Sequence, residues 1–446
     1  MASAPAQADS APAPKVLTLE QALEVALSEN ASVKVADMEI EKTGYSRAGT
    51  YSALFPQINA TGSYQRTIKK QVMYMDMEGF EGRGGFEVGR WNTWSAGVAA
   101  TMPIVNAQLW ESLRLSAADV ELAVEKARSS RLETVTQVKQ AYFAVLLARE
   151  AFNVYKSVYE NAVGNLELTQ KKYNAQRASE LDLARAKSSV ANAIPNVYDS
   201  ESSIILSLWQ LKAVMGVDLD ENIDVAGSLS DFTGHMFYDL HENDNFSLEN
   251  NSTMRQLDIQ AKQLASAVRT QKYANLPTLS LSYSYSINAM DNGLNFSQYK
   301  WSPYSYIGLS LSIPIFAGGK RYHAIKQAGV QAAELDVRKA DTERQLMISI
   351  RRYLNTMETS IKSYGAAQSA VETSTKAYDI ARKAYEVGRN TMTDLNDAQL
   401  QLTQAKLSVT QAIHNFLTAK SNLEGVLGAD FIGDDGKVIL NPTYDK

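Results

Sequence analysis

The sequence of 446 residues contains no cysteine, and this absence removes several classes of protein at once. Without thiols the chain can form no disulfide bond, no thiolate nucleophile, no cysteine zinc site and no lipid link through cysteine. Histidine is scarce as well, and its four residues follow no spacing typical of metal ligands: they are His235, His241, His323 and His414. We therefore expect no metal site and no other cofactor.

The sequence also lacks long apolar runs and an excess of basic residues. A membrane-spanning helix needs about 18 to 20 consecutive apolar residues, and no segment comes near that length. The formal net charge is -5, which gives no indication of nucleic-acid binding. Phosphate-binding loops and Gly-x-Ser-x-Gly elbows are absent too, so the protein is not expected to be an enzyme.

What the sequence does contain is an internal repeat, in which two halves are offset by about 211 to 221 residues. The corresponding segments are residues 29–33 (ENASV) with 250–254 (NNSTM), 102–104 (MPI) with 313–315 (IPI), Tyr173 with Tyr385, and Asp182 with Asp394. These pairs keep the same order along the chain. A duplicated architecture is therefore predicted, and each half should contain the same elements.

The repeat predicts a division of the chain into five parts. Residues 1–16 are interpreted as a flexible tail, left at the start of a mature protein after removal of a signal peptide. The first repeat covers residues 17–227 and the second covers residues 250–430. A linker at residues 228–249 joins the two repeats, and residues 431–446 form a C-terminal tail.

Each repeat contains one predicted β-hairpin, at residues 57–102 and 278–314. Leu279, Leu281, Tyr283 and Tyr285 alternate with serines, which is the period of a strand. The strands are about 10 to 12 residues long, and a tilted membrane-spanning strand needs about 9 to 11. Aromatic residues on or beside the strands are typical of an interfacial girdle. A soluble, half-buried hairpin would also alternate, so that alternative stays open.

The rest of each repeat is predicted to be helical, with unusually long helices. The first half should contain helices at residues 106–173 and 181–215, and the second at residues 320–388 and 394–427. Apolar residues in the first long helix recur mostly at spacings of three, four or seven, which indicates coiled-coil packing. At about 1.5 Å per residue, such a helix reaches on the order of 100 Å.

Four strands cannot close a barrel, and open strand edges are not tolerated in lipid, so strands should pair between chains. Two chains would give eight strands and a filled interior, whereas three would give twelve strands and leave room for a lumen. The sequence therefore predicts an α+β membrane protein, a trimer with a 12-stranded β-barrel (4 strands per protomer) continued by a 12-helix α-barrel.

Several segments resemble the TolC-type outer-membrane efflux and secretion factors. The segments are residues 17–23 (LTLEQAL), 26–30 (ALSEN), 102–104 (MPI), 313–319 (IPIFAGG) and 385–398 (YEVGRNTMTDLNDA). The resemblance covers about residues 17–430. It implies a passive exit channel of a tripartite efflux or type I secretion system, located in the bacterial outer membrane and extending through the periplasm. The linker and the C-terminal tail would then belong to an equatorial belt.

The resemblance also implies partners and a gate. The partners would be two further copies of the chain, a periplasmic adaptor protein, an inner-membrane pump of the RND or ABC type and outer-membrane lipid. By motif position, Asp182 and Tyr385 match gating links, and Asp394 and Asp397 match an acidic constriction ring. The arginine expected at the gate falls on Asn390, and Arg389 lies next to it, so the link is shifted or missing.

Two alternatives remain open at this point. Asp182 and Asp394 follow turns, so both residues could be simple helix N-caps without a role in a gate. The whole protein could also be a coiled-coil scaffold or adhesin of the cell envelope. The duplicated hairpins argue against a scaffold, because such a protein has no use for amphipathic strands of membrane length.

Overall fold

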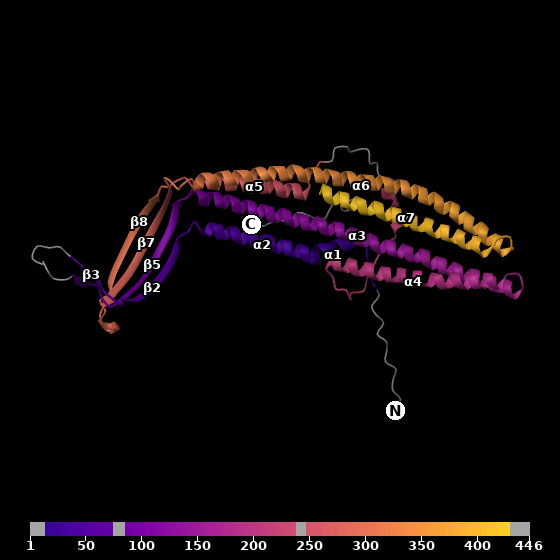
Figure 1. The fold of residues 1–446 in the computed structure, drawn as a ribbon, viewed down its shortest axis with the longest axis horizontal. Helices are drawn as coiled ribbons and strands as arrows, with labels where there is room; N and C mark the ends of the chain where they lie inside the picture. Colours follow the sequence, from indigo (N-terminus) through magenta and orange to yellow (C-terminus); the bar gives the residue numbers. More distant parts are fainter. Residues whose placement is uncertain (1–13, 75–84, 238–246, 429–446) are drawn as a thin grey trace, which may run out of the picture. The chain divides into compact units, whose positions relative to one another are not determined.

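The computed structural model describes residues 14–74, 85–237 and 247–428, which form long helices and a few strands (Figure 1). The helices are α1 (Leu19–Glu29), α2 (Ala31–Ser52), α3 (Ala107–Asn174), α4 (Glu180–Met215), α5 (Ser252–Tyr273), α6 (Lys320–Glu386) and α7 (Met392–Leu427), with the 3-10 helices η1 (Leu229–Phe237) and η2 (Phe296–Gln298). The strands are β1 (Lys15–Leu17), β2 (Gln57–Arg66), β3 (Gln71–Met73), β4 (Phe86–Val88), β5 (Asn92–Val105), β6 (Ile223–Val225), β7 (Thr278–Asp291) and β8 (Ser302–Ser312).

The chain divides into two compact units, and each unit takes segments from both predicted repeats. The helical unit comprises residues 1–40, 122–258 and 337–446, and the sheet unit comprises residues 41–121 and 259–336. Compactness and sequence correspondence are different criteria, so the predicted repeat boundaries stay a prediction. The C-terminal tail lies outside the described residues, as do most of the N-terminal tail and part of the linker.

The two longest helices are α3 with 68 residues and α6 with 67 residues, each about 100 Å long at 1.5 Å per residue. None of the described helices is both long and apolar enough to cross a membrane. Helix α4 contains Pro195 and still continues to Met215. Helices of this length need packing partners along their whole extent, because propensity alone stabilises a helix only marginally.

The sheet unit contains one four-stranded antiparallel sheet in the order β2-β5-β7-β8. Each half of the chain supplies one hairpin, and the pairing of β5 with β7 joins them. Strand β5 continues through Pro103 to Val105, three residues beyond the predicted end, and its register becomes irregular there. Proline cannot donate to the ladder, which explains the irregularity at the end of this central strand.

The N-terminal tail was predicted too long. Lys15 and Val16 belong to strand β1, which pairs in parallel with β6. Helix α3 holds this small sheet, because the Tyr142 hydroxyl lies 2.7 Å from the carbonyl oxygen of Ala226 and Arg149 donates to the Val225 carbonyl at 2.9 Å. The segment is therefore ordered by hydrogen bonds to residues far away in the sequence.

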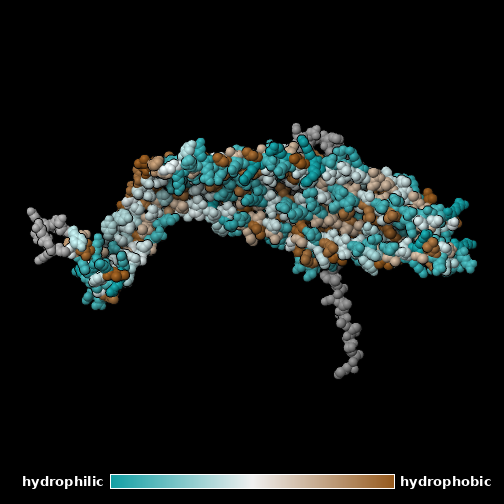
Figure 2. Space-filling model, in the orientation of Figure 1, coloured by the Kyte–Doolittle hydropathy of each residue, from teal (hydrophilic) through white to brown (hydrophobic). Residues whose placement is uncertain are grey.

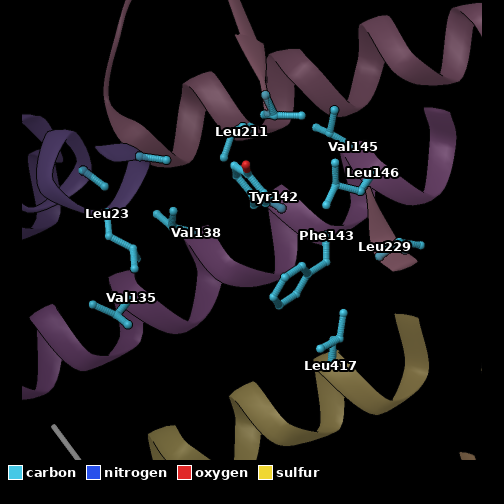
Figure 3. Packing of buried hydrophobic residues seen from close by; sticks show 14 of the residues in the cluster. Leu23, Val135, Val138, Tyr142, Phe143, Val145, Leu146, Leu211, Leu229 and Leu417 are labelled. Atoms are coloured by element: carbon cyan, nitrogen blue, oxygen red, sulfur yellow. The ribbon is translucent and has the colours of Figure 1, made fainter. Parts of the chain in front are cut away.

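The core of the helical unit includes Leu17, Ile223 and Val225 of this small sheet, and Figure 3 shows part of it. Side chains from α1, α3, α4 and α7 meet there, and Tyr142, Leu211 and Phe416 are at most 2% exposed. In Figure 3, Leu23 of α1 and Leu211 of α4 point toward the α3 residues Val138 and Tyr142. Burial of each such side chain contributes about 1.5 to 3 kcal/mol, so this region anchors the helices of the unit.

Helices α4 and α7, which have 36 residues each, have the same C-terminal structure. The side-chain amide of Asn30 donates to the Val214 carbonyl at 2.7 Å, and the side-chain amide of Asn251 donates to the Val426 carbonyl at 2.5 Å. Gly216 and Gly428 follow in the left-handed conformation, with φ angles of 77° and 64°. The internal repeat therefore extends to individual hydrogen bonds.

Candidate functional site

The four-stranded sheet has two chemically different faces. Residues paired across antiparallel strands point to the same side of a sheet. Tyr64 pairs with Trp94 on one face, whereas Thr61, Gly97 and Ser286 lie in register on the other. The alternation seen in the sequence therefore continues in register across all four strands.

The apolar face includes Ile58, Ala60, Tyr64, Trp94, Ala96, Val98, Ala100, Met102, Leu279, Leu281, Tyr283, Tyr285, Ile287, Ala289, Ile307, Leu309 and Leu311. The polar face includes Gln57, Asn59, Thr61, Ser63, Gln65, Thr93, Ser95, Gly97, Ala99, Thr101, Thr278, Ser280, Ser282, Ser284, Ser286, Asn288, Met290, Ser302, Tyr304, Tyr306, Gly308, Ser310 and Ser312. Strands β2, β5, β7 and β8 are described in full, and their polar face carries no charged side chain. It is hydrophilic and electrically neutral.

Both edges of the sheet are open in the single chain. Strands β2 and β8 each pair with one neighbour among the described residues, so their outer backbone groups face away from the sheet. Large apolar side chains beside these edges are exposed, with 69% for Ile58, 73% for Ile307 and 68% for Leu309. Open strand edges and exposed apolar side chains are unfavourable in water, so they indicate contact with another protein chain or with lipid.

Aromatic side chains gather on the apolar face, at the end of the sheet where the hairpins turn. Trp94 packs against Tyr64 with ring centroids 4.4 Å apart and against Phe296 at 5.3 Å. At the other end, Phe55 before β2 and Phe316 after β8 are 65% and 85% exposed. Aromatic residues at both ends of an apolar strand band are typical of membrane interfaces.

A second region of interest is the tip, which we define as residues 165–189 and 378–399, around the turns between α3 and α4 and between α6 and α7. Both turns have the same hydrogen bonds, from the Arg177 amide to the Lys172 carbonyl and from the Arg389 amide to the Ala384 carbonyl, each at 2.7 Å. Gln176 and Gly388 occupy the equivalent left-handed positions. These bonds close the C-termini of α3 and α6 in the same geometry.

The helices that follow the turns begin with capping boxes. Ser179 and Thr391 are the N-caps, and Asp182 and Asp394 are the third residues of helices α4 and α7. The alternative that the aspartates themselves are N-caps is therefore wrong in position, because each carboxylate instead accepts a hydrogen bond from the backbone N–H of the N-cap residue. Hydrogen bonds from Thr391 lower the pKa of the Asp394 carboxyl, which outweighs a weaker rise from desolvation.

Tyr385 lies at the centre of the tip contacts. Its hydroxyl is 2.8 Å from the Thr169 hydroxyl, and both residues are at most 5% exposed. Thr169 donates its only hydroxyl proton to the Asn165 carbonyl at 2.8 Å, so Tyr385 must be the donor in the shared bond. The Lys172 ammonium lies 4.2 Å from the centre of the Tyr385 ring and donates to the Tyr385 carbonyl.

Comparison with known proteins identifies this arrangement. The model of the outer membrane efflux protein family matches residues 22–217 and 245–429, which is most of the chain. The chain belongs to the outer membrane efflux protein family. Its function is that of an outer-membrane exit channel for efflux or type I secretion, and the family is one of channels rather than of enzymes.

Individual relatives are distant. The chain is 23% identical over 345 residues to the outer membrane protein TolC of Vibrio cholerae, covering 74% of this chain and 73% of that protein. It is 22% identical over 360 residues to the alkaline protease secretion protein AprF of Pseudomonas aeruginosa, covering 78% and 72%. The crystal structure of the Campylobacter jejuni CmeC outer membrane channel matches with a TM-score of 0.73 at 20% identity, covering 92% and 85%.

The other residues predicted to form the gate of this efflux protein also lie at the tip. Asp397 and Arg389 are exposed, and Asn390 is half-buried. Asp182 and Tyr385 are connected through Lys172: burial lowers the pKa of the Lys172 ammonium, and the charges of Glu386 and Asp182 raise it in part. The gate roles of the predicted residues therefore stay a prediction.

Thr169 and Lys172 were not predicted from the sequence. The sequence contains one indication of their role, because the two halves of the chain carry different residue types at these positions. With the offset of about 212 residues that relates the two turns, Thr169 corresponds to Ala381 and Lys172 to Ala384. The chain thus keeps polar side chains at one position of each pair and alanine at the other, which lets Thr169 and Lys172 of α3 hold Tyr385 of α6.

Proposed function

We propose that three copies of the chain assemble into one channel, with a 12-stranded β-barrel in the outer membrane and a 12-helix tunnel in the periplasm. The observation that carries this proposal is the four-stranded sheet, which has one apolar face, one neutral polar face and two open edges. In lipid each unsatisfied backbone group costs several kcal/mol, so β2 of one copy must pair with β8 of the next. The apolar face then meets lipid and the polar face lines the lumen.

The number of copies follows from the lumen. Eight strands from two copies would be filled by their own side chains, whereas twelve strands leave an aqueous passage. Exposed apolar side chains occur on the helices too, including Tyr198 at 66% and Leu206 at 57% on α4. Figure 2 shows hydrophobic residues scattered among hydrophilic ones over the visible surface.

The tip is the proposed gate. Opening would separate the α3–α4 pair from the α6–α7 pair within each copy, and it would break the contacts of Tyr385 with Thr169 and Lys172. Three copies of Asp394 and Asp397 near the axis would attract cations. Repulsion between the three copies of Asp394 would raise the pKa of that carboxyl, in the opposite direction from the effect of the capping box within one chain.

As partners we propose a periplasmic adaptor protein and an inner-membrane pump of the RND or ABC type. One relative is named for protease secretion and the family is named for efflux, and neither name favours one kind of pump over the other. A neutral polar lumen would exclude little except by size, so the pump would set the choice of cargo.

The test is the oligomeric mass of the detergent-purified protein together with its single-channel conductance in a planar bilayer. A trimer with cation-selective conductance is expected, and Asp394→Asn or Asp397→Asn should reduce the selectivity. Asp379→Asn is the matched control, because Asp379 is an exposed acid on α6 that is not part of the proposed ring. A monomer without bilayer activity would refute the channel and favour the envelope scaffold.

A further inference from the structure

Two tyrosines on the polar face of the sheet differ from the small polar residues around them. Tyr304 and Tyr306 of β8 pair with Ser286 and Ser284, so they share the face of the serines. The other tyrosines and the tryptophan of the four strands, Tyr64, Trp94, Tyr283 and Tyr285, all lie on the apolar face. Aromatic residues on the lipid side of a barrel are expected, whereas aromatic rings on the opposite side require another explanation.

The two rings form one unit. Their centroids are 5.8 Å apart with an angle of 42° between the ring planes. Tyr306 leans over Gly308, since two of its ring carbons lie 3.9 Å from the position that a β-carbon of Gly308 would occupy. Tyr304 is the more open of the two, with 61% exposure against 47% for Tyr306.

The surface beside the rings is low and uncharged. In register with Tyr304 lie Ser286, Gly97 and Thr61, and this row has no side chain larger than threonine. A flat molecule can therefore approach the rings closely. No charged side chain lies on this face within the four strands, so the negative faces of the aromatic rings are the main electrostatic feature.

We propose that Tyr304 and Tyr306 form a stacking subsite for organic cations that carry an aromatic ring. This inference rests on the proposed function, which places the polar face in the lumen and repeats the pair three times around the axis. The ring faces attract a cation, and offset stacking adds an attraction for a flat ring. The same ring faces repel an anion, so the subsite should bind a flat cation more tightly than a flat anion of similar size.

The test uses block of the reconstituted channel by benzyltrimethylammonium, added on the side of the hairpin turns. Tetramethylammonium supplies the charge without the ring, and benzyl alcohol supplies the ring without the charge. We expect benzyltrimethylammonium to block at the lowest concentration. Tyr304→Leu should raise its half-blocking concentration about threefold, and the double variant with Tyr306→Leu by up to about tenfold, as expected for loss of one or two exposed cation–π contacts.

Two controls separate the subsite from other causes. Tyr304→Phe keeps the ring, so benzyltrimethylammonium should block this variant at the same concentration as the natural protein. Tyr285→Leu removes a half-exposed tyrosine from the opposite face of the sheet and should leave the half-blocking concentration unchanged. If Tyr304→Leu does not assemble, Tyr306→Leu alone tests the same pair. Equal block of all variants, or equal loss in Tyr285→Leu, would overturn the subsite while the channel stands. Absence of conductance in the natural protein would instead overturn the channel and the subsite together.

Discussion

The hydrogen bond between Tyr385 and Thr169 allows a sharp test of the gate, because the two partners have different roles. Tyr385→Phe removes the donor, and Thr169 still donates to the Asn165 carbonyl, so no buried donor is left unpaired. The loss should be about 1 kcal/mol per chain. Thr169→Val removes the acceptor and leaves the Tyr385 hydroxyl buried without a partner, which should cost about 1 to 3 kcal/mol.

These values translate into channel opening. If opening breaks the bond, a loss of about 1 kcal/mol shifts the closed-to-open ratio about fivefold for one chain. Three copies that move together give about 3 kcal/mol, or more than a hundredfold. We therefore expect the open probability in single-channel records to rise in Tyr385→Phe and to rise further in Thr169→Val.

The double variant and a matched control complete the experiment. Tyr385→Phe with Thr169→Val removes both partners and should resemble Tyr385→Phe alone, since no unpaired hydroxyl remains. Tyr353→Phe makes the same chemical change on α6, far from the tip, and should not alter opening. A larger effect of Tyr385→Phe than of Thr169→Val, or no effect of either, would refute the assignment of donor and gate.

Three further outcomes follow from the helical unit. Gly388→Ala should lower the free energy of unfolding by about 1 to 2 kcal/mol, because alanine is strained in the left-handed conformation of this position. Gly428→Ala should lower it by more, because the new β-carbon of residue 428 would also overlap the Asn250 carbonyl. Denaturant unfolding of both variants tests whether Gly428→Ala is the less stable. Arg128→Met should cost about 3 to 5 kcal/mol in the same assay, because Glu125 is left buried without its partner; equal stability of Arg128→Met and the natural protein would contradict this. Burial lowers the pKa of His414 below its usual value of 6.5, so the unfolded chain binds more protons in that range and stability should fall as pH drops below 6.5; this component of the melting temperature should vanish in His414→Gln.

The elements of this protein could be predicted from sequence where one periodicity covers many residues. Period-two alternation in residues 279–287 located β7, and the absence of proline over residues 106–173 located α3. The pairing of β5 with β7 could not be predicted, because neither strand contains a signal for its partner in the other half of the chain. Strand β1 was missed for a similar reason, since three residues are too short for a pattern and only contact with β6 makes them a strand.

At the tip, too, contacts between segments far apart in the sequence could not be predicted, here for individual side chains. Motif positions predict Asp182 and Asp394 near helix starts, and Ser179 and Thr391, three residues before them, are the sequence signal of the two capping boxes. The position of Lys172 over the Tyr385 ring depends on how α3 and α6 pack, and no local pattern contains that information.

The two open edges of the sheet are not equivalent, since β2 comes from the first half of the chain and β8 from the second. A protomer in the proposed ring therefore binds one neighbour through each edge, in a head-to-tail manner. A chain with a damaged β8 could still join a ring through β2 and would then block its closure. When such a chain is expressed together with intact copies, the defect should therefore be dominant. One defective protomer would be enough to inactivate a trimer that also contains two intact protomers.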